Sequence, residues 1–135
     1  MTEVQIRKVA LILFLFFSIF CYSATFTSVA DGNWATPATW GKFGGGTPGV
    51  DYPSTGDNIN IESHVSYDAG IIVYGQLSVN SGSITFPAGS SAFETVGNMT
   101  LNAPLNMNGN SLFILKGNFD SSPSGLINMA DKTTV

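Results

Sequence analysis

Apolar and polar residues alternate in short runs along most of the chain beyond residue 24. The clearest runs lie at residues 59–61, 77–79, 84–86 and 99–101. Alternation with a period of two, bounded by Gly, Asn and Pro, is typical of short strands that bury one face. No stretch of this region has the spacing of an amphipathic helix of useful length. The pattern therefore predicts an all-β fold with almost no helix.

The strand runs recur at a nearly constant interval. Positions 75–80 read GQLSVN, positions 97–102 read GNMTLN and positions 117–120 read GNFD, so the units begin at Gly75, Gly97 and Gly117. A second set of runs, at 82–86 and 125–129, follows the first. Repeats of about 20 residues with one or two strands each predict a β-solenoid, whose stacked coils complete one another's hydrogen bonds. A small β-sandwich with evenly spaced turns is the alternative.

The N-terminal segment 1–23 has the pattern of an export signal. Arg7 and Lys8 precede the apolar run 9–20, which is shorter than the ~20 residues that a membrane-spanning helix needs. We expect cleavage after Ser23, because Cys21 and Ser23 then place small side chains at positions −3 and −1. The mature chain would contain no cysteine and no membrane span, and it would be secreted or displayed on the cell surface.

Two alternatives remain open for this segment. It could stay uncleaved as a membrane anchor, although its apolar run is short for that purpose. Cys21 could instead carry a lipid, but the bulky Phe20 stands where a lipoprotein signal has a small residue.

The charge balance excludes several classes of protein. The chain has 9 acidic and 5 basic residues, a net charge of −4 and only 10% charged residues. A nucleic-acid partner is not expected, since such a protein needs a basic face.

The single cysteine excludes a disulfide framework and a Cys-rich zinc site. A phosphate-binding loop and a Gly-x-Ser-x-Gly nucleophile elbow are also absent from the sequence.

An ordered series of motifs precedes the repeats. It consists of Trp34 and Trp40, the glycine-rich stretch 44–49, Pro53, the sequence GDNINI at 56–61, His64-Val65 and Asp68. This order resembles the opening of secreted β-helix proteins that are common in the Bacteroidota, and it is similar to the start of the extracellular eight-glycine domain. The resemblance covers about residues 33–128, and its specificity lies in the combined order rather than in any single piece.

The resemblance implies a right-handed parallel β-helix on an exported or cell-surface protein. Proteins of this kind are often long, adhesin-like and exported by type IX secretion. We accordingly expect a signal peptide at 1–23, a Trp- and Gly-rich capping segment at 24–56, and a few solenoid coils over 57–135. We expect another strand to begin near the end of the sequence, and we therefore expect the chain to be the N-terminal part of a longer protein. An uncovered last coil would also favour end-to-end self-association.

Four polar residues lie close together in the sequence: Asp57, Glu62, His64 and Asp68. A carboxylate pair could act as acid and base, and carboxylates with an imidazole could hold a divalent cation. A structural role is the stronger interpretation. Asp57 follows a turn glycine and can accept backbone N–H bonds, Glu62 alternates with isoleucines and faces solvent, and His64 caps a turn or fills the first coil. We therefore predict no catalytic residue, no metal site and no cofactor.

Three aromatic residues form the remaining candidate site. Trp34, Trp40 and Tyr52 could provide a platform on which sugar rings stack. The alternative, which we favour, is that the two tryptophans plug the N-terminal end of the solenoid and cover the apolar interior of its first coil.

The function expected from the sequence is that of an exported structural or adhesin-like protein that is not an enzyme. Its partners would be glycans or components of a cell surface or matrix. Two alternatives remain. One is a carbohydrate-binding module built on Trp34, Trp40 and Tyr52. The other is the N-terminal part of a β-helix polysaccharide-degrading enzyme, whose site would need clustered Asp, Lys or Arg on successive coils.

Overall fold

The computed structural model of the protein describes residues 23–70, 72–89, 92–109 and 111–130. These residues form thirteen short strands and one 3₁₀ helix. The strands are β1 (Thr25–Thr27), β2 (Gly32–Asn33), β3 (Asn58–Ile61), β4 (His64–Ser66), β5 (Ile72–Tyr74), β6 (Leu77–Val79), β7 (Ser83–Phe86), β8 (Ala92–Thr95), β9 (Met99–Leu101), β10 (Leu105–Met107), β11 (Leu112–Leu115), β12 (Phe119–Ser121) and β13 (Ile127–Met129). The helix, η1, spans Pro37–Trp40.

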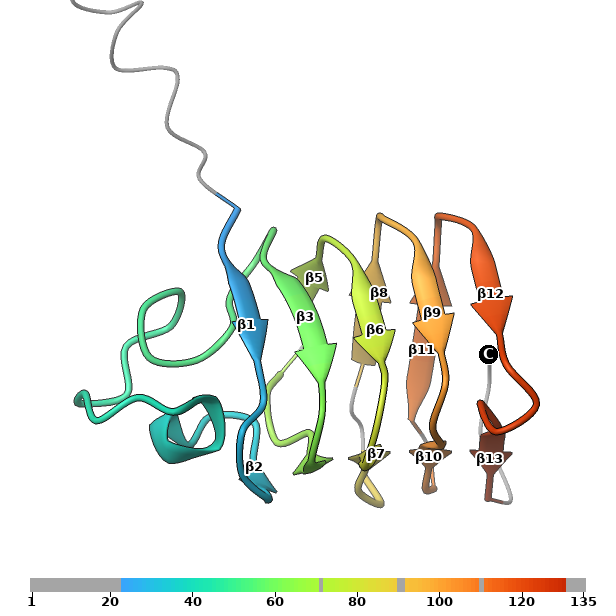
Figure 1. The fold of residues 1–135 in the computed structure, drawn as a ribbon, viewed down its shortest axis with the longest axis horizontal. Helices are drawn as coiled ribbons and strands as arrows, with labels where there is room; N and C mark the ends of the chain where they lie inside the picture. The colour runs from blue at the N-terminus through green and yellow to red at the C-terminus, as the bar shows by residue number, and fades with distance from the viewer. Residues whose placement is uncertain (1–22, 71, 90–91, 110, 131–135) are drawn as a thin grey trace, which may run out of the picture.

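The strands form three parallel sheets that run along one axis (Figure 1). Sheet A has the order β1-β3-β6-β9-β12, sheet B has the order β2-β4-β7-β10-β13, and sheet C has the order β5-β8-β11. Consecutive strands of the chain belong to different sheets, so each circuit of A, B and C makes one coil. Three circuits are complete within the described part of the chain, and the prediction of an all-β solenoid is confirmed.

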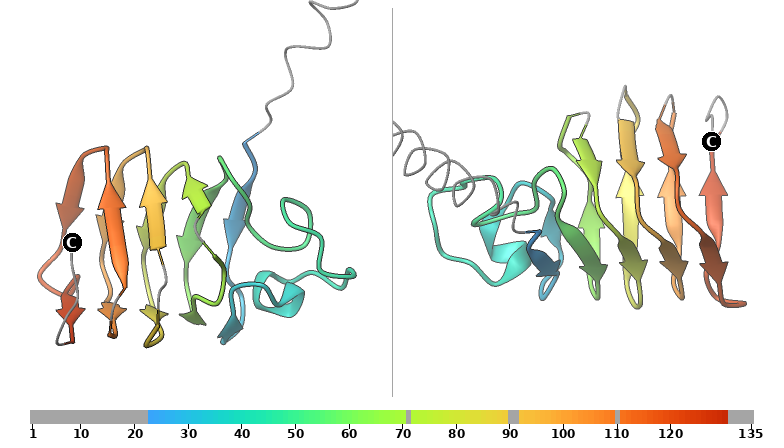
Figure 2. Two further views of the ribbon diagram at one scale, coloured as in Figure 1. Left: turned by 180° about the vertical axis from the view of Figure 1, so that it is seen from behind. Right: turned by 90° about the horizontal axis from the view of Figure 1, so that it is seen from above.

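The coils wind in a right-handed sense. In Figure 1 the strands of sheet A run downward on the near side while the chain advances from left to right, and the strands of sheet C return upward on the far side. The reverse view in Figure 2 shows the sheet C strands in front, still pointing upward. This handedness agrees with the rule for parallel crossover connections.

Inward-facing side chains stack in register from coil to coil. In sheet A the pairing aligns Phe26, Ile59, Leu77, Met99 and Phe119 in one inner row. The stretch of sequence between the first two partners of this row is long, and the stretches between the later partners are shorter and similar to one another. Corners absorb these differences in length, because only the strands must keep their register.

Close packing at one corner explains the glycine of each repeat. A Cβ atom on Gly97 would lie 2.6 Å from the carbonyl oxygen of Gly75, and one on Gly117 would approach the carbonyl oxygen of Gly97 more closely still. The three glycines therefore stack where adjacent coils leave no room for a side chain. The residue after each glycine carries an amide side chain, and that of Asn98 bridges two coils: its Oδ1 accepts a bond from the Asn118 N–H at 3.2 Å.

Segment 24–56, expected to be a cap, also begins the solenoid itself. Its β1 pairs with β3 in sheet A and its β2 pairs with β4 in sheet B. The rest of the segment leaves the coil path after β2 and projects from the end of the stack before returning at β3 (Figures 1 and 2).

Candidate functional site

The insertion between β2 and β3 is organised by its two tryptophans. Pro37 fixes the first turn of η1, and Gly41 ends the helix in a left-handed conformation with φ 66°. The indole Nε1 of Trp40 donates a hydrogen bond to the carbonyl oxygen of Trp34 at 2.6 Å. The helix thereby places Trp40 against the open end of the first coil.

Both tryptophans are buried in an aromatic cluster. Trp34 has 0% and Trp40 has 4% of its surface exposed. The ring centroid of Trp34 lies 5.0 Å from that of Trp40, 5.0 Å from that of Tyr67 and 5.1 Å from that of Tyr74, all in edge-to-face geometry. Trp40 in turn packs edge-on against Phe26 with centroids 6.0 Å apart. The pair therefore covers the interior of the first coil, as the plug interpretation requires.

This arrangement does not present the aromatic face that a sugar-binding platform needs. Trp34 and Trp40 turn no ring face to solvent, and Tyr52 is half-buried against the core. The exposed aromatic of the insertion is Phe43, whose side chain is 100% exposed. Sequence reasoning missed Phe43, and its place beside a glycine-rich stretch was the available signal.

Two tyrosines bring hydroxyl groups into the aromatic cluster. The Tyr67 hydroxyl donates to the carbonyl oxygen of Gly70 at 2.7 Å, whereas the Tyr74 hydroxyl and the Trp34 Nε1 are buried without a partner in the described residues. Burial raises the pKa of Tyr67 to about 12, and the neighbouring Asp68 carboxylate adds to the shift. Burial likewise raises the pKa of Tyr74 well above its usual range. Both phenols are therefore neutral at physiological pH and act as core residues.

Asp57 joins the insertion to the first two coils. Its Oδ1 accepts a hydrogen bond from the Ala24 N–H at 2.9 Å, and its Oδ2 accepts one from the Ser54 N–H at 2.8 Å. Asp57 is only 5% exposed. The expectation that this residue accepts backbone N–H bonds is confirmed.

The other three members of the predicted polar group are also engaged in contacts between coils. The Glu62 carboxylate accepts from the Asn80 amide at 2.8 Å and from the Ser81 hydroxyl at 2.9 Å, and Asp68 accepts from the Ala35 N–H at 2.9 Å. The His64 Nδ1 lies 2.9 Å from the hydroxyl oxygen of Ser83. Glu62 and His64 are exposed, in agreement with the expected position of Glu62.

The described side chains of this polar group do not form a metal-binding cluster. Across the described ranges, no three His, Cys, Asp or Glu side chains are placed so that they could hold a metal ion together. A further buried carboxylate, Asp51, was missed by sequence reasoning. Its Oδ2 accepts from the Gly46 and Thr47 N–H groups at 3.0 and 2.9 Å and closes the glycine-rich loop. An acidic residue soon after three glycines was the signal for this role.

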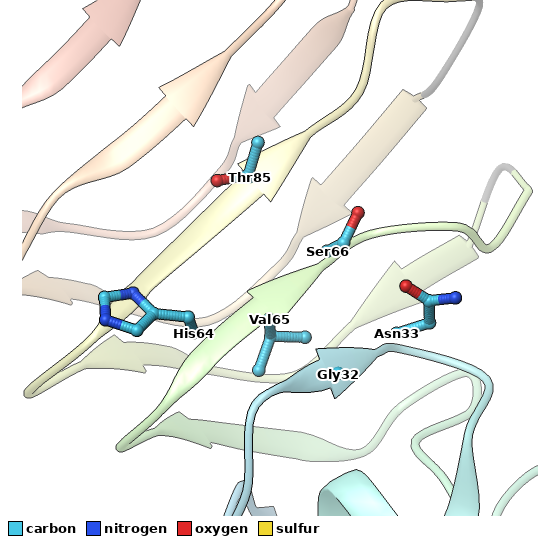
Figure 3. Close-up of a pocket in the computed structure, with 6 residues that line it drawn as sticks. All are labelled: Gly32, Asn33, His64, Val65, Ser66 and Thr85. Atoms are coloured by element: carbon cyan, nitrogen blue, oxygen red, sulfur yellow. The ribbon is translucent and has the colours of Figure 1, made fainter.

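A shallow groove of about 290 Å³ follows sheet B where β2 ends. Figure 3 shows Asn33, Ser66 and Thr85 in a row along it, with His64 set to one side. The first three are register partners in β2, β4 and β7. The row continues through Asn106, whose amide donates to the Thr85 hydroxyl oxygen at 3.2 Å. The groove is thus part of a longer polar ladder.

A second groove, of about 390 Å³, lies between β1 and the insertion. The free edge of β1 forms one wall, and Lys42 and Val50 belong to the other. In the part of the chain that the structure describes, Lys42 makes no ion pair, whereas Lys116 pairs with Glu94.

Comparison with known proteins does not assign the chain to a family. No protein-family model, no curated protein and no solved structure matches the chain. Among the described residues, no helix has the length and apolar character to cross a membrane.

Proposed function

We propose that the protein is an exported structural or adhesin-like protein, secreted or displayed on the cell surface, and that it is not an enzyme. The observation that carries this proposal is the pair of regular polar rows along the solenoid. The outer row of sheet A consists of Thr27, Asn60, Ser78, Thr100 and Asp120, and that of sheet B consists of Asn33, Ser66, Thr85, Asn106 and Asn128.

Such rows suit a ligand that is itself repetitive. Adjacent strands of a sheet lie about 4.8 Å apart, so each row offers hydrogen-bonding groups at a constant interval along the axis. Hydroxyl and amide groups each contribute little to binding, but many of them acting on one polymer give appreciable avidity. A polysaccharide of a cell surface or matrix has the matching chemistry. Asp120 is the one charged residue in the two rows, so both rows are nearly neutral.

The non-catalytic part of the proposal is supported by the occupied carboxylates. Asp57, Glu62 and Asp68 each accept hydrogen bonds that hold coils together. A general acid or base must instead be free to reach a substrate. The proposal of export rests on the sequence of the segment 1–23, of which positions 1–22 lie outside the described part.

Export is tested by expressing the full chain and locating it by surface proteolysis and in the medium. We expect the wild-type protein outside the cytoplasm and a variant with Leu13→Arg and Phe16→Arg retained inside, because two charges disrupt the apolar run that export requires. Equal retention of both proteins would contradict the proposal.

Adhesion is tested with beads that carry the exported protein and surfaces that carry cell-wall polysaccharides. We expect Asn106→Asp to reduce retention, since it places an unpaired charge in the centre of the sheet B row. Val96→Asp is the control, because Val96 is exposed and lies outside both rows. Equal retention of the two variants would contradict a role for the row, and breakdown of a polysaccharide by the wild-type protein would contradict the non-catalytic assignment.

A further inference from the structure

Asp57 is a buried carboxylate that lacks a cationic partner. It accepts hydrogen bonds from the neutral N–H groups of Ala24 and Ser54, and it forms no ion pair within the described residues. Asp57 is 5% exposed, so its carboxylate has lost most of its hydration when ionised, and this loss is costly unless an opposite charge lies nearby. The position therefore favours a positive charge on one of its two donors.

One of these donors can acquire such a charge. Ala24 follows the bond at which the sequence predicts signal-peptide cleavage, between Ser23 and Ala24. Hydrolysis there adds one water molecule: the Ser23 carbonyl carbon takes the hydroxyl group, and the Ala24 nitrogen takes the proton. The released amine binds a further proton from solvent, because an α-amino group has a pKa of about 8.

We propose that cleavage after Ser23 creates an α-ammonium group on Ala24 that forms an ion pair with Asp57 and fastens β1 to the second coil. The inference rests on the proposed export of the chain. Ala24 already lies in the required place, since its nitrogen is 2.9 Å from the Asp57 Oδ1 and its carbonyl oxygen accepts from the Asn58 N–H at 2.8 Å. Little movement is needed when the amide becomes an ammonium group.

The geometry selects this bond over its neighbours. Cleavage one residue later would remove Ala24 and leave the Asp57 Oδ1 without this donor. Cleavage one residue earlier would place the new charge on Ser23, whose hydroxyl donates to the carbonyl oxygen of Gly56 at 2.8 Å. The ammonium group would then be one residue away from the carboxylate.

Asp51 provides a matched control. It is 7% exposed and accepts two backbone N–H bonds, from Gly46 and Thr47, as Asp57 accepts two. Both of its donors lie inside the insertion and stay amides whether or not the chain is cleaved. A difference between the two aspartates that depends on cleavage would therefore report the new charge.

The first test is the intact mass of the exported protein. We expect a chain that begins at Ala24. An exported chain that begins at another residue would overturn this inference and leave the proposed function standing. A chain that is neither cleaved nor exported would overturn both.

The second test compares thermal unfolding of the exported protein with that of the uncleaved full chain, held by Ser23→Leu and solubilised in mild detergent. We expect Asp57→Asn to lower the melting temperature by about 5 °C more in the exported form than in the uncleaved one, since charge-assisted bonds are about twice as strong as neutral ones. Asp51→Asn should have the same effect in both forms. An equal effect of Asp57→Asn in both forms would overturn the proposal.

A third measurement needs no substitution. We expect the Asp57 carboxylate to raise the pKa of the α-amino group above its ordinary range of about 8 in the exported wild-type protein, as followed by NMR. A pKa at or below that range would overturn the ion pair even if the Asp57 variant does not fold.

Discussion

The two ends of the solenoid both place a phenylalanine in the inner row of sheet A, but one of these side chains is buried and the other is half exposed. At the N-terminal end, Trp40 covers Phe26, and Trp34 is buried behind it. At the other end, Phe119 is 49% exposed, and Met129, the register partner of the buried Met107 in sheet B, is exposed to a similar extent. The difference shows that a coil cannot bury its own inner row: a neighbouring coil or an inserted cap must cover it.

The inner row of sheet A makes the point residue by residue. Phe26, Met99 and Phe119 occupy the same position of the coil, and the first two are buried while the last is not. Their local sequences do not distinguish them. We therefore expect the free energy of unfolding to depend on an inner-row residue only as far as a neighbouring coil or the cap covers that residue.

The largest effect is expected from loss of the cap. Trp34→Ala should lower the free energy of unfolding by about 3–5 kcal/mol, because it empties the centre of an aromatic cluster. Phe43→Ala is the control in the same insertion and should change little, since that side chain is fully exposed. Urea denaturation measures both. If the two substitutions cost the same, the insertion does not act as a cap.

The next effect separates the two ends along one row. Met99→Ala should cost about 2–5 kcal/mol, whereas Phe119→Ala should cost less than about 1.5 kcal/mol, because half of that ring is already in water. Chemical denaturation again gives the values. A cost for Phe119→Ala as large as that for Met99→Ala would mean that its exposed side is covered in solution, and sedimentation would then show whether a second copy covers it.

The smallest effect concerns the amide bonds between coils. The Asn58 Oδ1 accepts from the Gln76 N–H at 2.9 Å near the capped end, and the Asn98 Oδ1 accepts from the Asn118 N–H near the uncovered end. Each replacement by Ala should cost about 0.5–1.5 kcal/mol. In the Asn58→Ala variant the Gln76 N–H loses its acceptor. Its amide hydrogen should therefore exchange faster than in the wild-type protein, mainly through local opening. Protection of Asn118 should be low even in the wild-type protein, and strong protection there would contradict the contrast between the ends.

The solenoid was predictable because close packing between coils requires the same residue type at the same position of each repeat. Gly75, Gly97 and Gly117 recur since no side chain fits between the coils at that corner. Sheet C was not predicted, and the reason lies in its outer positions. Val73 and Ile114 pair with Glu94 on the outer side of that sheet, so apolar residues occupy both faces and the alternation disappears.

The start of the solenoid was hidden for a different reason. β1 and β3 are register partners although the whole insertion lies between them, whereas β3, β6, β9 and β12 follow one another at shorter and similar intervals. The insertion breaks the period, so the repeats did not reveal β1 and β2, and the boundary expected at position 57 followed from the motif GDNINI at 56–61. The cap itself was foreseeable from Trp34 and Trp40, since an open apolar end must be covered. The partners of Asp57 were not, because Ala24 and Ser54 meet it only after the coil has closed.

The direction of the hydrogen bonds has a mechanical consequence. The bonds between coils run along the axis of the stack, so tension along that axis pulls each strand directly away from its neighbour and does not shear one strand past another. A chain pulled from its last described coil would release one circuit at a time. Each step of about 20 residues would add about 70 Å of extended length. The capped end would yield last, because its aromatic cluster is buried while the other end is partly exposed.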